Sequence, residues 1–472
     1  MKKNKNNKLF ISMIIFIISF SFLLLLFFKV DPDYFWHVKA GEYMVKNGII
    51  HTDVFSWFVS GKYWMCHEWL FDVIIYGMKV IFGEIHVIIY SFVCVVGLLL
   101  ILFLTNKDYY MKNIPYTLVY YFFFFLLIIR YLQARPHMIS FSLFALMIYV
   151  LYDLYKNQDS KKIYFLPIIS IIWANVHGGS SNLPYLFCLL FLIGGLFSFK
   201  CKKIEAERMS NKQLIKYLVV MILCLLGVLV NIHGVLMFIY PYQNMMNQVM
   251  LQNIMEWQST SFNEISHYTY LLFLVFLIFT MLFSDKKIKF MDLLLLGVVM
   301  YLGLKSIRFW MYTYLVMSYV IFDYVPKRSI DKGTIAGIGI MSTAFILLTL
   351  ININSIINID YSYSFDSKDI SVIKKGNPKR LYNMYDYGGE LIYNGIPVFI
   401  DGRADLYSPY NYKDYLDISV LHNDYVELID KYDFDYFLVD EKYPISTYLK
   451  YNDNYKLIYK NKKILMYKKI VN

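Results

Sequence analysis

The sequence predicts an α-helical polytopic membrane protein with about eleven transmembrane helices and a C-terminal extracytoplasmic α/β domain. Three observations predict this class. Hydrophobic residues make up 58% of the 472 residues and charged residues only 17%, whereas soluble domains carry about 25% charge. Apolar runs long enough to cross a bilayer recur from Phe10 to Ile351. The basic residues gather in short loops between these runs, as in the cytoplasmic loops of membrane proteins.

The apolar runs define the expected spans. Because the lipid interior cannot satisfy bare backbone polar groups, each run is expected to be a helix. The predicted spans are residues 9–29, 84–104, 114–131, 138–155, 163–177, 184–199, 217–232, 269–283, 290–305, 309–325 and 334–351. The first run is longer than the core of a usual signal peptide and no small-residue cleavage site follows it, so we expect an uncleaved first helix.

Alternation of these spans gives the predicted orientation. With a cytoplasmic N-terminus, the inner loops are 106–113, 156–162, 200–216, 284–289 and 326–333, and each carries lysine or arginine. This distribution follows the positive-inside rule and makes the C-terminal domain extracytoplasmic. The same placement argues against nucleic acid as a partner, despite the net charge of +11. Of the five cysteines only Cys66 falls in an outer segment, so no disulfide framework is expected.

Two domains are expected. Residues 1–351 form the transmembrane domain, which includes a first outer loop, 30–83, with short amphipathic helices and four tryptophans as interfacial anchors. Residues 352–472 are polar and form the α/β domain. In it, strands are expected at 380–384, 397–400 and 436–439, a helix at 420–432, and a hairpin of 455–459 with 464–468. The sequence has no internal repeat and no glycine-rich phosphate loop.

The candidate catalytic residues directly follow the first predicted span. Asp31 and Asp33 stand in the segment 31–37 (DPDYFWH), and acids at the end of a membrane helix are costly unless they are solvated or functional. Pro32 prevents the first helix from continuing. If a second helix begins near Asp33, then Asp33 and His37 share one of its faces. The pair then suits acid–base chemistry or metal binding, although Asp33 also suits a helix N-cap.

Three arginines are candidate ligands of a donor phosphate, because a guanidinium pairs well with phosphate oxygens. Arg135 opens an Arg-Pro-His turn before the fourth span, and Arg308 lies at the outer end of the ninth. Both positions also suit an arginine that reaches the lipid headgroups. Arg403 stands in 401–405 (DGRAD) after a predicted strand, where a turn with a local ion pair is the alternative.

Further polar residues gather at the outer helix ends. His67 and Glu68 are adjacent, so on a helix they diverge by about 100° and cannot bind one metal without other ligands. Glycines after His177 end an apolar helix, so this end of the helix is expected to line a cavity reached from outside. The supporting candidates are His37, His67, Glu68, His137, Asn175, His177, Asn231, His233 and Glu256. No spacing is diagnostic of a metal, so a divalent metal cofactor is left open.

Six segments carry a resemblance to a broad group of bacterial polytopic membrane proteins. They are 31–37 (DPDYFWH), 67–70 (HEWL), 135–137 (RPH), 173–179 (WANVHGG), 256–259 (EWQS) and 399–407 (FIDGRADLY). The topology and the acidic motif further resemble the GT-C glycosyltransferases, such as protein O-mannosyltransferases and oligosaccharyltransferases. This resemblance implies a GT-C-like bundle, a polyprenyl-phosphate sugar donor, and an acid of the first outer loop as the base. Only Asp31 and Asp33 match that position, and the acceptor would be a glycan, a lipid or a protein.

The sequence therefore favours a glycosyltransferase of the cell envelope that acts on the outer side of the membrane. A transporter or flippase of lipid-linked glycans should carry ionisable residues at mid-membrane and repeat symmetry, whereas the span centres here are mostly apolar. A non-enzymatic assembly protein would instead use the C-terminal domain to bind a partner. A hydrolase would need two carboxylates that flank the scissile bond, with Glu68 as the second.

Overall fold

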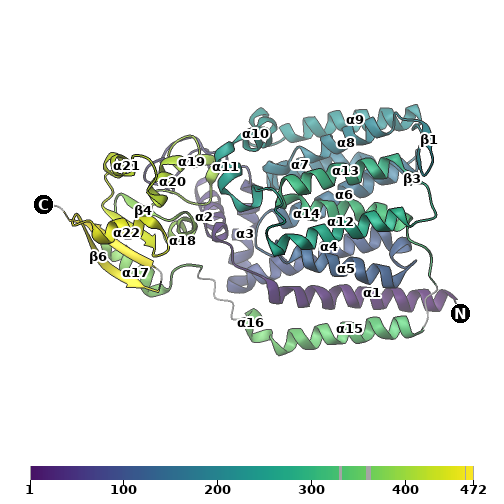
Figure 1. Ribbon diagram of the computed structural model, residues 1–472, viewed down its shortest axis with the longest axis horizontal. Coiled ribbons are helices and arrows are strands. Elements are labelled where there is room, and N and C mark those ends of the chain that lie inside the picture. The colour runs from purple at the N-terminus through teal and green to yellow at the C-terminus, as the bar shows by residue number, and fades with distance from the viewer. Residues whose placement is uncertain (1, 329–331, 358–362, 463, 471–472) are drawn as a thin grey trace. The chain divides into compact units, whose positions relative to one another are not determined.

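The chain folds into two compact units, seen here in a computed structural model that describes residues 2–328, 332–357, 363–462 and 464–470 (Figure 1). Unit 1 contains Met1–Lys29, Ile85–Met246 and Leu251–Ile359. Unit 2 contains Val30–Glu84, Asn247–Met250 and Asp360–Asn472. The sequence assigned the loop 30–83 to the transmembrane domain, whereas in the structure this segment packs with the tail. Of the predicted inner loop 326–333, residues 329–331 lie outside the described residues.

Unit 1 is a helical bundle. Its long helices are α1 (Lys2–Leu24), α4 (His86–Tyr110), α5 (Ile114–Ile128), α6 (His137–Lys156), α7 (Leu166–Val176), α8 (Leu183–Gly194), α9 (Asn211–Leu229), α12 (Tyr268–Leu282), α13 (Phe290–Lys305), α14 (Trp310–Val320) and α15 (Lys332–Ile351). Each predicted span overlaps one of these helices. Shorter elements are α10 (Val235–Met246), α16 (Ile353–Ile357) and a small sheet of β1 (Phe199–Cys201), β2 (Ile204–Ala206) and β3 (Ile288–Lys289). The short helix α11 (Gln248–Asn253) is divided between the units, since its residues up to Met250 belong to unit 2.

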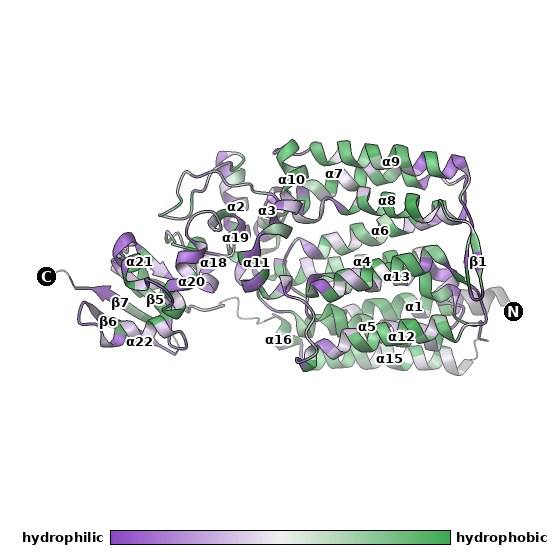
Figure 2. Cartoon of the chain, turned by 45° about the horizontal axis from the view of Figure 1, so that its top comes forward, coloured by the Kyte–Doolittle hydropathy of each residue, from purple (hydrophilic) through white to green (hydrophobic). Residues whose placement is uncertain are grey.

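The helices of unit 1 are apolar along most of their length (Figure 2). Six segments of the described chain are long and apolar enough to cross a membrane: Asn7–Phe27, Trp69–Tyr110, His137–Lys156, Asn211–Leu229, Ile265–Leu282 and Gly333–Ile351. The chain is therefore a multi-pass membrane protein, and the number of about eleven crossings stays a prediction.

Close helix contacts in unit 1 depend on glycine. A Cβ atom added to Gly194 would lie 2.6 Å from Cε of Met291, so α8 and α13 approach closely at this end. A Cβ added to Gly303 would lie 2.0 Å from Oη of Tyr270, which packs α12 against α13 in the same way. Such contacts hold helices together where lipid supplies no hydrophobic driving force.

Unit 2 contains a four-stranded sheet in the order β4-β5-β7-β6, with β4 (Leu381–Asn383), β5 (Tyr436–Asp440), β6 (Tyr455–Asn461) and β7 (Ile464–Lys469). The strands β4 and β5 are parallel and the other pairs antiparallel. Its helices are α2 (Pro32–Asn47), α3 (Trp69–Phe82), α17 (Ser367–Gly376), α18 (Gly388–Tyr393), α19 (Ala404–Tyr407), α20 (Tyr412–Val420), α21 (Tyr425–Tyr432) and α22 (Pro444–Tyr451).

The structure confirms the predicted strands near 380–384 and 436–439 and the C-terminal hairpin. It corrects two other predictions in the tail. Residues 397–400 form no strand, and Val398 makes only an isolated parallel bridge to Ser56. The predicted helix 420–432 begins only at Tyr425, because the chain turns at Leu421, whose φ of 60° lies in the left-handed region.

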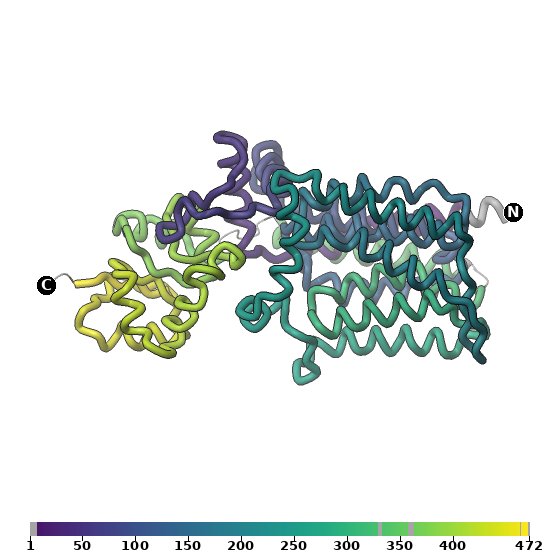
Figure 3. The backbone as a smooth tube through the Cα atoms, turned by 90° about the horizontal axis from the view of Figure 1, so that it is seen from above, coloured from purple at the N-terminus to yellow at the C-terminus, as the bar shows by residue number. Residues whose placement is uncertain are grey.

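The first outer loop belongs to the core of unit 2. Trp57 donates a hydrogen bond from Nε1 to the carbonyl of Leu381 over 3.0 Å, and its ring stacks on Phe399 with centroids 5.6 Å apart. Figure 3 shows this loop, in purple, against the green and yellow tail. The prediction of four interfacial tryptophans is wrong for Trp36 and Trp64, which are 5% and 2% exposed inside unit 2.

Candidate functional site

Unit 1 gathers charged and aromatic side chains near the starts of α6 and α14. We call Arg135, His177, Glu256, Trp257 and Arg308 the arginine cluster. Arg135 donates a hydrogen bond from Nη1 to Oε1 of Glu256 over 3.0 Å. The Arg308 guanidinium lies 5.3 Å from the centre of the Trp257 ring. Both arginines therefore contact one short turn, η5 (Met255–Trp257).

The turn before α6 fixes the position of Arg135. The carbonyl of Arg135 accepts a hydrogen bond from Oη of Tyr90 over 2.8 Å. His137 donates from Nε2 to the carbonyl of Tyr131 over 2.8 Å. Pro136 occupies the N-cap position of α6. The backbone of the turn is thus held on both sides, and the predicted supporting residue His137 acts here as a structural hydrogen-bond donor.

His177 connects Arg308 to the interior of the bundle. Arg308 donates from Nη2 to Nε2 of His177 over 2.6 Å. Because a guanidinium can only donate, Nε2 is unprotonated and Nδ1 carries the proton. Nδ1 then donates to Oγ of Ser140 over 2.7 Å, and Trp173 donates to the same oxygen over 3.0 Å. This chain of hydrogen bonds through His177 and Ser140 fixes the orientation of the Arg308 guanidinium.

The remaining predicted residues of unit 1 bind one another. Asn175 donates to the carbonyls of Ile171 and Val230, each over 2.8 Å. Asn231 donates to the side-chain oxygen of Asn175 over 3.1 Å, and its own side-chain oxygen accepts the backbone N–H of His233 over 2.9 Å. These three predicted residues thus join the ends of α7 and α9.

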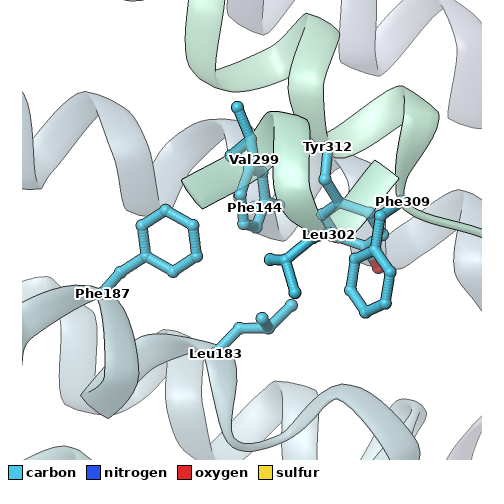
Figure 4. A pocket seen from close by; sticks show the side chains of 7 residues that line it. All are labelled: Phe144, Leu183, Phe187, Val299, Leu302, Phe309 and Tyr312. Atoms are coloured by element: carbon cyan, nitrogen blue, oxygen red, sulfur yellow. The ribbon is translucent and has the colours of Figure 1, made fainter. Parts of the chain in front are cut away.

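An apolar pocket is lined in part by Phe309, the residue that follows Arg308 (Figure 4). A gap of about 190 Å³, a volume that includes open solvent and is too narrow to admit a water molecule, is lined by Phe144, Leu183, Phe187, Val299, Leu302, Phe309 and Tyr312. The helices α8 and α13, which touch closely at Gly194 and Met291, supply four of these side chains near their other ends. The lining contains no charged side chain, and in this conformation the gap has no ligand-sized space.

Unit 2 gathers the acidic motif of the first outer loop and two segments that lie far from it in sequence. We call His37, His67, Glu68, Asp72 and Asp405 the acid–imidazole cluster; Asp33 lies on the same helix as His37, α2. The N-cap of α2 is Asp31, not Asp33, because Asp31 accepts the backbone N–H of Asp33 over 2.9 Å. Asp33 instead lies in the first turn, where a Cβ added to Gly402 would stand 1.6 Å from its Oδ1. Only glycine at position 402 leaves room for this carboxylate.

His37 and Asp72 form the buried end of the acid–imidazole cluster. His37 donates from Nδ1 to Oδ1 of Asp72 over 2.6 Å, and both side chains are 0% exposed. Cys66 donates to the other Asp72 oxygen over 3.3 Å. A Cβ added to Gly41 would lie 2.0 Å from the Asp72 carbonyl oxygen, so glycine lets α2 and α3 approach closely enough for this contact.

Glu68 continues the acid–imidazole cluster towards its more exposed end. One Glu68 oxygen lies 3.6 Å from Nε2 of His37 and the other 3.5 Å from Nε2 of His67. His67 in turn lies 3.9 Å from Asp405. Carboxylates and imidazoles alternate along this line, which suits the cluster to hold and move protons.

Burial and neighbouring charges shift the pKa values of two groups near Glu68, the His67 imidazole and the Cys66 thiol. Burial lowers the pKa of His67, but the carboxylates of Glu68 and Asp405 outweigh it, so that the pKa is raised. Burial raises the pKa of the Cys66 thiol well above its usual value, and the neighbouring Asp72 adds to this. Cys66 is therefore a thiol at neutral pH rather than a nucleophilic thiolate.

Arg403 has a different environment from the other two predicted arginines. It donates from Nε and Nη2 to the two oxygens of Asp401 over 2.8 and 2.6 Å, and from Nη1 to Asp53 over 2.7 Å. The residue is 2% exposed, and its guanidinium lies 4.5 Å from the centre of the Trp64 ring. Burial opposes its charge, but chiefly Asp401 raises the pKa of Arg403 further. This arrangement favours the predicted ion-pair alternative over phosphate binding.

Within the described residues, no three His, Cys, Asp or Glu side chains are grouped so that they could hold a metal ion. The sequence analysis gave no role to Asp72 and Asp405 of the acid–imidazole cluster, to Trp257 of the arginine cluster, or to Asp53, which pairs with Arg403. A signal was present for Asp72, since an acid in an apolar helix is costly unless paired. Asp53 had none, because its partner Arg403 is 350 positions away.

The fold is similar to that of the oligosaccharyltransferase of Archaeoglobus fulgidus. A structure tethered with an acceptor peptide containing the NVT sequon superposes with a TM-score of 0.50 at 12% identity, covering 92% of this chain and 69% of that one. A structure of AglB from the same organism, in complex with an inhibitory peptide and a dolichol-phosphate, gives a TM-score of 0.52 at 11% identity over 91% and 69%. No protein-family model and no curated protein matches the chain. The chain therefore shares the GT-C fold of this archaeal enzyme.

Proposed function

We propose that the chain is a membrane glycosyltransferase that transfers a sugar from a polyprenyl-phosphate donor to an acceptor on the outer side of the membrane. The arginine cluster carries this proposal. Two guanidinium groups contact one turn, and Arg135 and Glu256 remain 22% and 44% exposed. An anion with several oxygens, such as a phosphate, matches such a pair better than a single carboxylate.

The apolar side chains that line the pocket support a lipid-linked donor. One of them, Phe309, directly follows Arg308. A polyprenyl phosphate combines an anionic head with an apolar chain, and these two features match the arginine cluster and the apolar side chains next to it in sequence. The archaeal AglB structure contains a dolichol-phosphate, which has the same combination. The peptide in the related structure supports a peptide among the acceptor classes.

The proposed chemistry is one displacement at the anomeric carbon. The acceptor's nucleophilic atom forms a bond to this carbon as the bond from carbon to phosphate oxygen breaks. Asp33 or Asp31 takes the acceptor proton as general base. The electron pair of the broken bond goes to the polyprenyl phosphate, whose charge Arg135 and Arg308 stabilise.

Copurification tests the donor class. The protein, purified in mild detergent, is extracted with organic solvent, and polyprenyl phosphates are measured by mass spectrometry. We expect a polyprenyl phosphate at near-stoichiometric amount, and its loss in the Arg135→Ala/Arg308→Ala double variant. Arg380→Ala is the matched control, because Arg380 is exposed and pairs with Asp433 on the surface of unit 2. Equal lipid content in all three proteins would contradict the proposed site.

Cysteine labelling tests the proposed orientation. Cys201, the native cysteine with an exposed side chain, is first changed to serine. An impermeant thiol reagent should then label Lys442→Cys in intact cells but not Lys161→Cys; both lysines are exposed. After cell lysis both should be labelled. The opposite pattern in intact cells would place the C-terminal tail in the cytoplasm.

A further inference from the structure

Lysines converge at the end of unit 1 that lies opposite the arginine cluster. The arginine cluster lies near the starts of α6 and α14, whereas these lysines surround the turn η8 (Ile321–Asp323), which directly follows α14. They come from the loop after α4, the end of α6, the loop after α12 and the strand β3. We call Lys112, Lys156, Lys286 and Lys289 the lysine cluster. Four segments that are distant in sequence thus bring positive charge to one turn.

Two members of the lysine cluster pair with the carboxylate of this turn. Nζ of Lys156 lies 3.0 Å and Nζ of Lys289 3.5 Å from Oδ2 of Asp323. The nearby carboxylate of Asp292 accepts hydrogen bonds from two tyrosine hydroxyls, over 2.5 and 2.6 Å. The one carboxylate that pairs with the lysine cluster is therefore shared between Lys156 and Lys289.

The other two members, Lys112 and Lys286, bond main-chain oxygens and form no ion pair with a carboxylate of the described residues. Nζ of Lys286 donates to the carbonyl of Asp323 over 2.6 Å, and Nζ of Lys112 donates to the carbonyl of Phe322 over 3.5 Å. Carbonyls at the end of a helix carry only a partial negative charge. Two ammonium groups thus stand on neighbouring carbonyls without a carboxylate partner of their own.

Repulsion within the lysine cluster acts on Lys112. Burial lowers the pKa of Lys112, and the charges of Lys286 and Lys327 lower it further, against the opposing effect of Asp323. Like charges at short distance disfavour the protonated form of a lysine. An anion bound between the ammonium groups would offset this repulsion.

Exposed apolar side chains precede the lysine cluster in sequence. Phe279, Leu282 and Phe283 at the end of α12 are exposed, Phe283 to 78%, and the exposed Lys286 follows three residues later. Apolar side chains exposed at the end of an apolar span suit contact with lipid acyl chains. An anion that carries acyl chains therefore matches both features, whereas a soluble anion matches the lysines alone.

We propose that the lysine cluster binds the headgroup of an anionic phospholipid. The lipid phosphate accepts hydrogen bonds from Lys112 and Lys286, and the acyl chains lie along the end of α12. Lys156 and Lys289 hold Asp323, and with it the turn that positions the other two lysines. These loops are the ones predicted to face the cytoplasm, where anionic lipids give the membrane surface a negative potential. The inference is independent of the proposed function.

Lipid binding to the full-length protein in detergent micelles tests the inference. Native mass spectrometry gives dissociation constants for phosphatidylglycerol, whose phosphate carries one negative charge, and for phosphatidylcholine, whose headgroup has no net charge. We expect tighter binding of phosphatidylglycerol. Lys112→Gln/Lys286→Gln should weaken it by about fivefold for each lysine removed, the equivalent of the about 1 kcal/mol that a basic residue contributes near anionic lipid. Equal affinity of the wild type for both lipids would overturn the proposal.

Lys200→Gln/Lys202→Gln is the matched control, because it removes two exposed lysines from the hairpin of β1 and β2, in the sheet that also contains β3. It should leave the affinity for phosphatidylglycerol nearly unchanged. Equal losses in the two double variants would reveal a general effect of surface charge and overturn the site. If the first double variant does not fold, Lys286→Gln alone decides, since this side chain is exposed: a loss of about fivefold supports the site and no loss overturns it.

A competition experiment distinguishes a lipid from a soluble anion. Glycerophosphoglycerol contains the phosphodiester of phosphatidylglycerol without its acyl chains. We expect that an equimolar amount of it leaves phosphatidylglycerol bound, because the acyl chains contribute to the affinity. Displacement at equimolar concentration would assign the lysine cluster to a soluble phosphate and overturn the lipid site.

Discussion

Arginines are used in opposite ways in the two units. In unit 1, Arg135 is 22% exposed and donates a hydrogen bond of 3.0 Å to a carboxylate that is 44% exposed. In unit 2, the Arg403 side chain is 1% exposed and pairs with Asp53 and Asp401, both 0% exposed. Water and ligands reach the first guanidinium but not the second. Exposure, rather than residue type, therefore decides which arginine is available to a substrate.

The carboxylates of unit 2 show the same division. Asp53 and Asp401 neutralise Arg403 and hold the first outer loop to the tail. Glu68 and Asp405 keep side-chain exposures of 11% and 14% next to His67. The buried acids have a structural partner that they cannot leave at low cost. The partly exposed acids remain candidates for proton transfer.

The largest expected effect is on sugar transfer. Asp31 caps α2, so we predict that Asp33 is the base. Asp33→Asn should lower turnover by about 10²–10⁴-fold, the usual loss for a general base, while donor binding persists. Asp31→Asn should remain folded and retain most activity, because asparagine caps a helix nearly as well as aspartate. Incorporation of radiolabelled sugar in native membranes measures both.

A reversed result would be equally informative. If Asp31→Asn is inactive and Asp33→Asn active, Asp31 combines capping with catalysis. If both variants retain full turnover, the general-base mechanism proposed for unit 2 is wrong. Folding of each variant is checked by its unfolding temperature.

The second prediction compares the two arginines by stability. Arg403→Met leaves two buried carboxylates without their cation and should cost about 3–5 kcal/mol of unfolding free energy. Arg135→Met removes the partly exposed ion pair with Glu256 and should cost less, about 1 kcal/mol for that pair. Chemical unfolding of the purified full-length proteins provides both values. A small loss for Arg403→Met would mean that its ion pairs do not hold unit 2 together.

The local sequence did not predict which arginines and carboxylates are buried in ion pairs and which remain exposed. The apolar runs gave each helix of the bundle, because span length and hydrophobicity are local properties. The strand near 397–400 was predicted from β-propensity, yet Phe399 packs in the core without a paired strand. Strand formation needs a partner at the right place, which is a non-local property.

Among the candidate site residues, too, some roles were predictable from the local sequence and others depend on distant partners. Arg135 and Arg308 were recognisable as charges at helix ends. The role of Arg403 depends on Asp53, which packing brings together with it from 350 positions away. The predicted N-cap fell on Asp33 instead of Asp31, a shift of two residues, because helix boundaries are poorly defined by sequence alone. The sequence pattern predicts the helices and strands, whereas long-range packing determines which side chains contact one another.

The third prediction concerns the space around Asp33. Gly402→Ala would place a Cβ 1.6 Å from Oδ1 of Asp33, so the carboxylate or the loop must move. We expect a loss of about 1–3 kcal/mol in stability, as for other overpacked sites, together with reduced transfer. Gly77→Ala is the matched control, because no atom lies within 4 Å of its added Cβ. If Gly402→Ala matches this control, Asp33 is not confined by the loop.

The smallest expected effect is a pH dependence of unit 2 stability. The carboxylates of Glu68 and Asp405 outweigh burial and raise the pKa of His67 above its usual 6.5. A raised folded-state pKa means that the native protein binds the proton more tightly than the unfolded chain. The contribution is therefore complete below about pH 6.5 and is lost as the pH rises through the folded-state pKa.

The expected loss of stability with rising pH can be measured by thermal unfolding. Unfolding temperatures recorded between pH 6 and pH 8 should fall with increasing pH in the wild type, and the fall should shrink in Glu68→Gln, because the carboxylate that stabilises the His67 imidazolium is gone. Glu42→Gln on α2 is the matched control, since hydrogen bonds from Lys46 and Lys39 lower the pKa of Glu42 below 4.5 and its titration lies outside this range. It should keep the wild-type slope. An identical slope in Glu68→Gln would show that His67 and Glu68 titrate independently, and the acid–imidazole cluster would then be a set of neighbours rather than a coupled proton-holding unit.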